Sequence, residues 1–176
     1  MRVLVAGVGN TLRCDDAFGV IAARKLEAMT WPEGVTVMEV GISGMSLVYE
    51  LMDGYDALIV MDIVDRGRPP GTIMLIEPDL ADPASLTHDQ KHSLGGNTHL
   101  ATPSQVMLMA KSMGTLPSSV LLVACQPLDA EGVGMELSAE VTAGVDVAVA
   151  EVGAQIDRLL GGTDEPLAPQ IEGHEH

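Results

Sequence analysis

Short apolar runs are spaced along the chain and are separated by glycine, proline and charged residues. Apolar runs of this length, bounded by turn residues, are typical of buried β-strands. The pattern predicts five strands, at Arg2–Ala6, Val35–Val40, Ala57–Met61, Thr72–Ile76 and Ser119–Ala124.

Between these runs, apolar side chains recur every three or four residues, which predicts amphipathic helices. The last helix is the clearest, because one narrow arc holds Val141, Val145, Ala148, Val152, Ile156 and Leu159. The first helix follows Asp15 and is marked by Phe18, Ile21, Ala22, Leu26 and Met29. Two more helices are expected, at Gly44–Met52, with Ser43 or Ser46 as its cap, and at Thr102–Met113.

The alternation of strands and helices predicts an α/β domain with a largely parallel sheet. One connection breaks this pattern. Only Ile63 to Gly71 join the third and fourth strands, whereas a parallel crossover needs about a dozen residues or more. The fourth strand is therefore expected to run antiparallel, at an edge of the sheet.

The length of 176 residues fits one domain, which we place at residues 1–160. The segment Gly161–His176 is rich in glycine, proline and acids, a composition typical of a disordered tail. Ala81–Asn97 is polar and contains His88 and His92. It is expected to be a long loop with a functional role or without fixed structure.

The formal net charge of -16 argues against nucleic acid and anionic membranes as partners, because both attract clustered Lys and Arg. No run approaches the roughly 20 apolar residues of a membrane span, and the short apolar start does not resemble a signal peptide. Cys14 and Cys125 are the only cysteines and fit thiols in a reducing compartment. We therefore expect a cytoplasmic protein, and a monomer.

The turn after the first strand contains Gly7-Val8-Gly9, which half matches the dinucleotide fingerprint G-x-G-x-x-G. Glu39, near the end of the second strand, falls where a ribose-binding acid would lie. The third glycine of the fingerprint is replaced by Leu12. Asp15 and Asp16 would also repel a pyrophosphate at the start of the following helix. Dinucleotide binding stays open as an alternative function.

The adjacent acids have a structural explanation and a functional one. Asp15 is expected to cap the following helix, which leaves Asp16 to be explained. Asp62 follows the third strand, and functional residues of open α/β sheets gather at the carboxyl ends of the strands. His99 precedes a helix that leads into the fifth strand. Asp16, Asp62 and His99 would form a site for a borderline divalent metal such as nickel or zinc.

Other catalytic motifs are absent from the sequence, including H-E-x-x-H, G-x-S-x-G and C-x-x-C. The terminal Gly173-His-Glu-His176 is a poor frame for a metal, because a flexible tail does not hold its ligands in place. Together with the excess of acids, it nevertheless suggests a second alternative, a noncatalytic nickel chaperone.

The segment from Gly7 to Gly19, GVGNTLRCDDAFG, resembles the opening motif G-x-G-N-x-L-x-x-D-[ED]-x-x-G of the hydrogenase maturation proteases. Further segments agree in the same order over roughly residues 2–160, at Leu58–Asp62, Asp65–Gly67, Thr98-His99, Val123–Pro127 and Gly134–Ser138.

This resemblance implies a three-layer α/β/α sandwich with a five-stranded sheet, and an endopeptidase that trims the C-terminus of the [NiFe]-hydrogenase large-subunit precursor. It also implies that Asp16, Asp62 and His99 contact nickel that the precursor supplies and that the peptidase does not keep. Many members have Glu at the position of Asp16, so the carboxylate arm is one methylene shorter here. His88 and His92 compete with His99 for the role of the imidazole ligand.

Overall fold

The computed structural model describes residues 1–85 and 102–161. Its strands are β1 (Val3–Val8), β2 (Val35–Gly41), β3 (Ala57–Ile63), β4 (Ile73–Ile76) and β5 (Ser119–Cys125). Its α-helices are α1 (Phe18–Glu27), α2 (Gly44–Leu51), α4 (Pro103–Ser112) and α5 (Ala139–Leu160). Two short 3-10 turns, η1 (Cys14–Ala17) and η2 (Pro83–Ser85), complete the described elements.

The five strands form one sheet in the order β2-β1-β3-β5-β4. β1, β2, β3 and β5 are parallel, whereas β4 pairs antiparallel with β5 and lies at the edge of the sheet. The prediction from the short connection after β3 is therefore confirmed. β1 lies directly beside β3, with Gly7 opposite Met61, so the loops that follow these two strands emerge next to each other.

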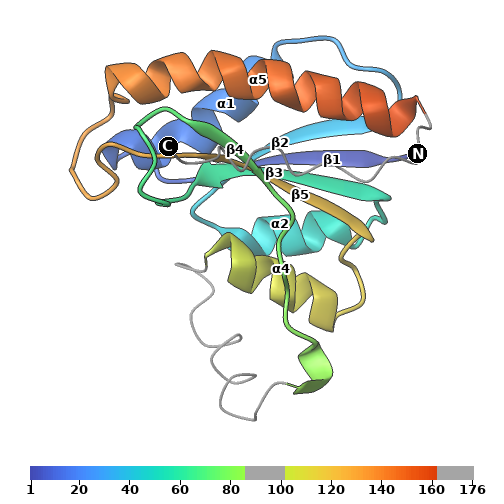
Figure 1. Ribbon diagram of the computed structural model, residues 1–176. Helices are drawn as coiled ribbons and strands as arrows, with labels where there is room; N and C mark the ends of the chain where they lie inside the picture. The colour runs from blue at the N-terminus through green and yellow to red at the C-terminus, as the bar shows by residue number, and fades with distance from the viewer. Residues whose placement is uncertain (86–101, 162–176) are drawn as a thin grey trace, which may run out of the picture.

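Helices cover both faces of the sheet, as Figure 1 shows. One face packs against α1 and α5, with Phe18, Leu26, Val145, Val152 and Ile156 fully or almost fully buried. The other packs against α2 and α4 through Leu47, Leu51, Val106 and Met107. The apolar arc of α5 and the α/β/α sandwich are thus confirmed. No described helix has the length and apolar character needed to cross a membrane.

The start of α1 lies against the backbone of two strands without a side chain between them. A Cβ atom at Gly19 would overlap the carbonyl oxygens of Met61 and Val8, and one at Gly7 would overlap the carbonyl oxygen of Gly19. Gly9, at φ 140°, allows the turn after β1 to lie against the carbonyl of Asp16. These contacts fix η1 and α1 against the carboxyl ends of β1 and β3.

Two expected caps differ from the structure. Ser43 occupies the N-cap position of α2, but its side chain makes no capping hydrogen bond. Asp15 does not cap the first helix, because it lies inside η1 and its carboxylate binds a distant loop. Residues 162–176, the expected tail, lie outside the described residues, so that expectation and the single-domain boundary at residue 160 stay predictions.

Candidate active site at the carboxyl ends of the strands

Asp16 and Asp62 both lie at the carboxyl ends of β1 and β3. These strand ends are on the left side of the sheet in Figure 1. Asp62 is the last residue but one of β3, and Asp16 belongs to the η1 turn that follows β1. The two carboxylates are close enough for the negative charge of Asp16 to raise the pKa of Asp62. The strand-end rule therefore located both side chains at one place.

The Asp62 carboxyl group is held in a partly dehydrated position. Its residue is only 7% exposed, and the Oδ1 atom accepts one hydrogen bond, from the N–H of Ile63 at 2.8 Å. Within the described part of the chain, no donor bonds its Oδ2 atom. Burial, and to a smaller degree the charge of Asp16, raises the pKa of Asp62 to about 7 despite the bond from Ile63. A carboxyl group of this kind exchanges a proton near neutral pH.

Asp16 is the more accessible of the two acids, being half-buried. Its Oδ2 atom accepts a hydrogen bond from the N–H of Asn10 at 3.1 Å. Burial, and to a smaller degree the charge of Glu131, raises the pKa of Asp16. The hydrogen bond from Asn10 and the charge of Arg13 lower the pKa, but the net shift is upward. Two neighbouring carboxyl groups with raised pKa values form a site that gains stability when a cation binds.

Asp15 has a role that the sequence did not indicate. It is fully buried, and it binds the loop that precedes α5. Its Oδ2 atom accepts hydrogen bonds from the N–H groups of Leu128 and Asp129, both at 2.9 Å, and from the Ser138 hydroxyl at 3.1 Å. Its Oδ1 atom accepts the N–H of Ser138 at 2.7 Å.

The pKa of Asp15 moves in the opposite direction from that of Asp62. Burial raises it, but the hydrogen bonds from Asp129, Ser138 and Leu128 together outweigh burial and lower the pKa below its ordinary value. Asp15 is therefore a charged structural anchor that joins η1 to the 128–138 loop. Residues 113 to 123 positions apart make these contacts, so spacing along the chain carried no signal for them.

Gln126 fixes the loop that follows Asp62. Its side-chain oxygen accepts the N–H groups of Arg66 at 2.7 Å and Arg68 at 3.1 Å, and its amide nitrogen donates to Asp65 at 2.9 Å. Asp65 in turn accepts the N–H of Gly67 at 2.9 Å. The motif segments Asp65–Gly67 and Val123–Pro127 therefore bind each other, a contact that the sequence does not indicate.

A small pocket of about 290 Å³ lies beside the glycine-rich turn, where a nucleotide would be expected. Leu12, Gly41 and Ile42 are among its lining residues. Glu39, the candidate ribose ligand, is engaged there by Arg24 in two parallel hydrogen bonds of 2.9 Å. An acid paired in this way does not offer its oxygens to a ribose, which argues against the dinucleotide alternative.

His99, the third predicted site residue, lies outside the described residues, as do His88 and His92. Within residues 1–85 and 102–161 no three His, Cys, Asp or Glu side chains are grouped to hold a metal. Thr102, three positions after His99, caps α4 by accepting the N–H of Gln105. The first turns of α4 reach the same end of the sheet, because Val106 contacts Gly44, which follows β2.

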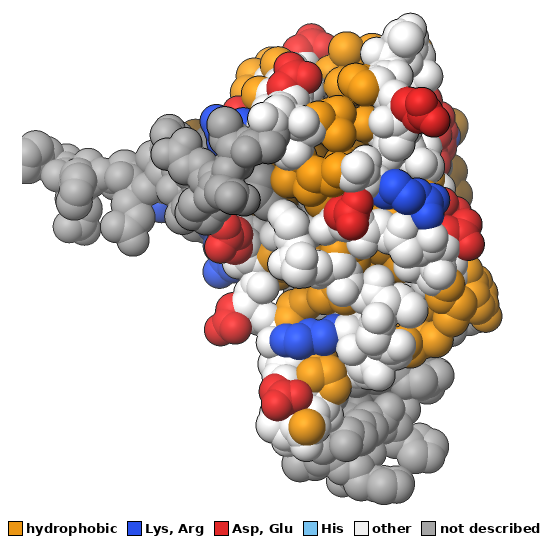
Figure 2. Space-filling view, turned by 90° about the vertical axis from the view of Figure 1, so that its right-hand side faces the viewer, with side chains coloured by type: hydrophobic (Ala, Val, Ile, Leu, Met, Phe, Trp, Pro, Cys, Tyr) orange, Lys and Arg blue, Asp and Glu red, His pale blue; other side chains and the backbone are white. Residues whose placement is uncertain are grey.

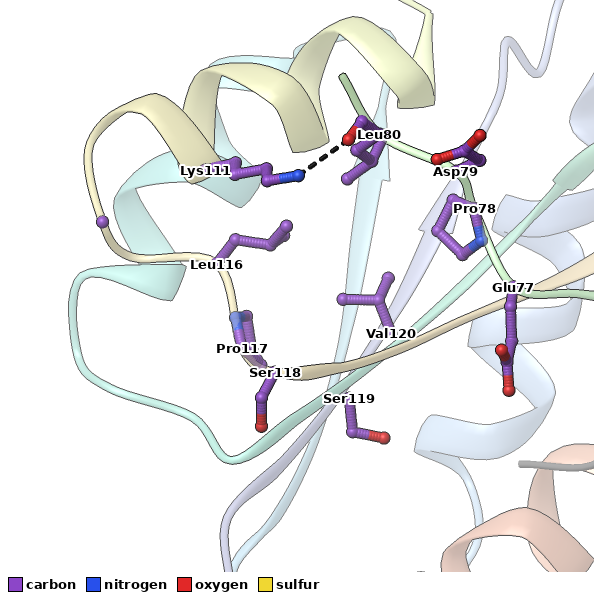
Figure 3. Close-up of a pocket in the computed structure, with 11 residues that line it drawn as sticks. Glu77, Pro78, Asp79, Leu80, Lys111, Leu116, Pro117, Ser118, Ser119 and Val120 are labelled. Atoms are coloured by element: carbon purple, nitrogen blue, oxygen red, sulfur yellow. Dashed lines mark hydrogen bonds between the residues drawn. The ribbon is translucent and has the colours of Figure 1, made fainter. Parts of the chain in front are cut away.

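A larger pocket of about 680 Å³ lies at the other end of the sheet. It is lined by the segment before β5 and by the segment after β4. Figure 2 shows this end of the molecule, where the parallel strands begin, and apolar, acidic and basic side chains are interspersed on it. In Figure 3 Lys111 extends to the carbonyl of Leu80, at 2.7 Å, while the carboxyl groups of Glu77 and Asp79 lie apart from it. The residues that line this larger pocket include no buried pair of acids. The site with Asp16 and Asp62 is therefore the better candidate for catalysis.

Known proteins are similar to this chain in sequence and in fold. The family model described as hydrogenase maturation protease matches residues 20–155. The hydrogenase expression/formation protein HupD of Rhizobium leguminosarum bv. viciae is 36% identical over 161 residues, which are 91% of this chain and 76% of that protein.

Solved structures agree with these sequence matches. The hydrogenase maturating endopeptidase HybD of Escherichia coli superposes with a TM-score of 0.69 at 27% identity, covering 92% of this chain and 94% of that one. A hydrogenase 2 maturation peptidase from Thaumarchaeota archaeon SCGC_AB-539-E09 gives a TM-score of 0.63 at 31% identity, covering 89% and 98%.

The fold and these matches define an endopeptidase of hydrogenase maturation. The chain belongs to the hydrogenase maturation protease family, whose reaction is cleavage of the [NiFe]-hydrogenase large subunit at its C-terminus. The family resemblance seen in the sequence is confirmed.

Proposed function

We propose that this peptidase cleaves a nickel-loaded large-subunit precursor, and that Asp16, Asp62 and His99 complete the coordination of the precursor's nickel. One observation carries the proposal: two carboxylates from separate segments converge at the rim of the sheet, where the charge of one raises the pKa of the other. Such a pair is unfavourable by itself and becomes favourable when a cation lies between the two groups.

The available donors suit that role. Carboxylate oxygens and an imidazole nitrogen are suitable ligands for a borderline ion such as nickel, and they bind it less strongly than thiolates would. Cys125, below the rim, is fully buried. Burial, with the charge of Asp15, raises its pKa to about 12, so it is not a thiolate that could withdraw nickel from the precursor. A site of this kind detects the metal and then releases the product together with it.

His99 is proposed as the third ligand because of its place in the sequence. It precedes Thr102 by three positions, and α4 begins there and reaches the same end of the sheet as Asp16 and Asp62. Within residues 1–85 and 102–161 no group of three His, Cys, Asp or Glu side chains could hold a metal, so the third donor is proposed from outside the described residues.

Hydrolysis adds one water molecule across the scissile peptide bond. The large subunit gains a new C-terminal carboxylate, and the released extension gains a free amine. Two routes to an activated water fit the site. Nickel polarises the scissile carbonyl, or the free oxygen of a carboxylate takes a proton from the water. In both routes, the nickel holds the scissile bond near the acids, which makes cleavage selective for the loaded precursor.

The test compares nickel-loaded and nickel-free precursor with wild-type protein and with Asp62→Ala and His99→Ala. Intact-mass spectrometry measures loss of the C-terminal extension. We expect wild type to process only the loaded precursor, and each variant to be slower by about 10³-fold or more, within the range seen when a general base or a metal ligand is lost.

A matched control is Asp146→Ala, an exposed acid on α5 that pairs with Lys25, which should process the precursor normally. Normal cleavage by both site variants would contradict the assignment of Asp62 and His99. Efficient cleavage of nickel-free precursor by wild type would show that the metal is not what the enzyme recognises.

A further inference from the structure

Five large apolar side chains are exposed on the loops around the acid pair. They are Leu12, Ile42, Leu128, Val133 and Met135, with exposed fractions of 59%, 54%, 60%, 93% and 75%. We call this set the apolar rim. The remaining exposed large apolar side chains among the described residues lie on helices, within two residues after a helix, or at the start of the chain. Leu12 and Ile42 line the same small pocket as Gly9, so the rim begins directly beside the turn that carries Asp16.

The loops that carry the apolar rim bind each other through their backbones. The N–H of Cys14 donates to the carbonyl of Gly134 at 2.9 Å, and the N–H of Gly134 donates to the carbonyl of Leu12 at 3.1 Å. Gly134 lies between Val133 and Met135 in the sequence. Leu12, Val133 and Met135 are therefore presented from neighbouring stretches of backbone.

Further hydrogen bonds hold this arrangement in place. Asp15 binds the N–H of Leu128, and the Asp129 carboxylate accepts the N–H groups of Glu131 at 3.0 Å and Gly132 at 2.7 Å. Because the backbone of these loops is already fixed, little backbone freedom is lost when a partner covers the apolar side chains, which favours binding. Exposed apolar groups beside a functional site mark an interaction surface.

We infer that the apolar rim is the docking surface for an apolar segment of the large-subunit precursor next to the scissile bond. The inference rests on the proposed function, because it takes the precursor as the occupant. The family reaction cleaves the large subunit, and the proposed function requires that polypeptide to reach Asp16 and Asp62. Leu12 lies four positions before Asp16, and Glu131 is near enough for its charge to raise the pKa of Asp16. A polypeptide bound at the acid pair therefore meets the rim.

The apolar rim makes binding depend on the precursor's sequence, whereas the acid pair makes it depend on nickel. These two contributions are separable. Loss of rim contacts should weaken binding of nickel-loaded and nickel-free precursor by the same factor, whereas Asp62→Ala should weaken binding of the loaded form only. The rim thus determines which precursor is bound, and the acid pair determines when it is cut.

The experiment measures affinity of the purified protein for both forms of the precursor, and steady-state kinetics with the loaded form. The test variant is Val133→Ser with Met135→Ser, and the matched control is Met113→Ser with Val147→Ser, two exposed apolar residues on α4's end and α5. We expect the rim variant to raise Kd for both forms and KM for the loaded form by about tenfold or more, with kcat nearly unchanged. Its thermal unfolding should match wild type, because both side chains are already exposed.

Wild-type affinity and KM in the rim variant, or an equal loss in the control, would overturn the inference. Sedimentation of the wild type provides a second check: a dimer that the rim substitutions convert to monomer would assign the surface to a second copy of the chain instead. If nickel makes no difference to binding but the rim variant is still weakened, the nickel proposal fails and the docking surface stands.

Discussion

The strand end around Asp62 and the loop anchor around Asp15 are neighbouring regions with opposite electrostatics. Both carboxyl groups are buried. Among the described residues, Asp15 accepts four hydrogen bonds and Asp62 accepts one. The pKa of Asp15 is lowered, whereas that of Asp62 is raised to about 7. The difference shows that donors around the acid decide whether a buried carboxylate stabilises the fold or is kept reactive. One region maintains the architecture, and the other holds an acid that is unfavourable until a ligand arrives.

The largest expected effect is a gain of stability when Asp62 is neutralised. The folded state binds its proton more tightly than the unfolded chain does, so wild type loses stability as pH rises from about 4 to about 7. Asp62→Asn removes this loss and should raise the free energy of unfolding at pH 8 by up to about 4 kcal/mol, from a pKa difference of roughly three units. Urea unfolding at pH 8 and pH 4 measures this, and the two proteins should converge at pH 4.

The same variant should no longer process the loaded precursor. A stability gain with full activity would separate the raised pKa of Asp62 from its proposed role, and no gain at pH 8 would show that burial does not penalise this carboxylate. Asp65→Asn is a matched control, because Asp65 is an exposed acid three positions away whose pKa is lowered by the side-chain bond from Gln126 and the bond from Gly67. It should not gain stability at pH 8.

The opposite result is expected at the loop anchor. Asp15→Asn places an amide group where the carboxylate now accepts bonds from Leu128, Asp129 and Ser138. The variant should lose about 3 kcal/mol of stability at pH 7, as expected when hydrogen bonds to a buried charge are broken.

The pH dependence distinguishes this loss from a simple packing defect. Because the pKa of Asp15 is lowered by folding, its contribution is present above about pH 4 and disappears as pH falls through the folded-state pKa. The difference between Asp15→Asn and wild type should therefore shrink in acid. A difference that is constant from pH 7 to pH 3, measured by thermal unfolding, would contradict an electrostatic role.

The smallest effect concerns the length of the acid at position 16. Asp16→Glu keeps the charge and adds one methylene. Asp16 is half-buried, and within residues 1–85 and 102–161 its side chain has one hydrogen bond, from the N–H of Asn10. We expect processing to fall by less than about tenfold, equivalent to about 1.4 kcal/mol. Asp16→Asn keeps the length and removes the charge, and it should lose far more activity. Equal rates for the two variants in the intact-mass assay would show that charge at this position is unimportant.

Much of the fold was predictable because local patterns determine it. Apolar runs gave the strands, the arc from Val141 to Leu159 gave α5, and the short connection before Thr72 gave the antiparallel strand. The strand-end rule placed Asp16 and Asp62 together, because parallel strands end at one edge of the sheet.

Other features depend on contacts that spacing does not encode. Asp15 was expected to cap its own helix, but its partners lie in a loop more than 100 positions later. The missing third glycine of the nucleotide fingerprint counted against close packing of helix and strand, yet Gly19 provides that packing from inside α1. The position of Glu39 at the end of a strand suggests a ribose ligand, but Arg24, fifteen positions earlier, binds its carboxylate in the fold.

The contact at Gly19 also has a consequence for how this domain can change over time. Where α1 meets the carbonyls of Met61 and Val8, backbone atoms alone determine the separation of helix and sheet. Exchanges among Val, Ile and Leu elsewhere in the core can change the tilt of α1 away from Gly19. They cannot change the separation at Gly19, because no side chain lies between helix and sheet there. Substitutions in the hydrophobic core therefore have little effect on the position of Asp16 relative to Asp62. Related chains can differ widely in core composition and keep the same spacing between these two acids.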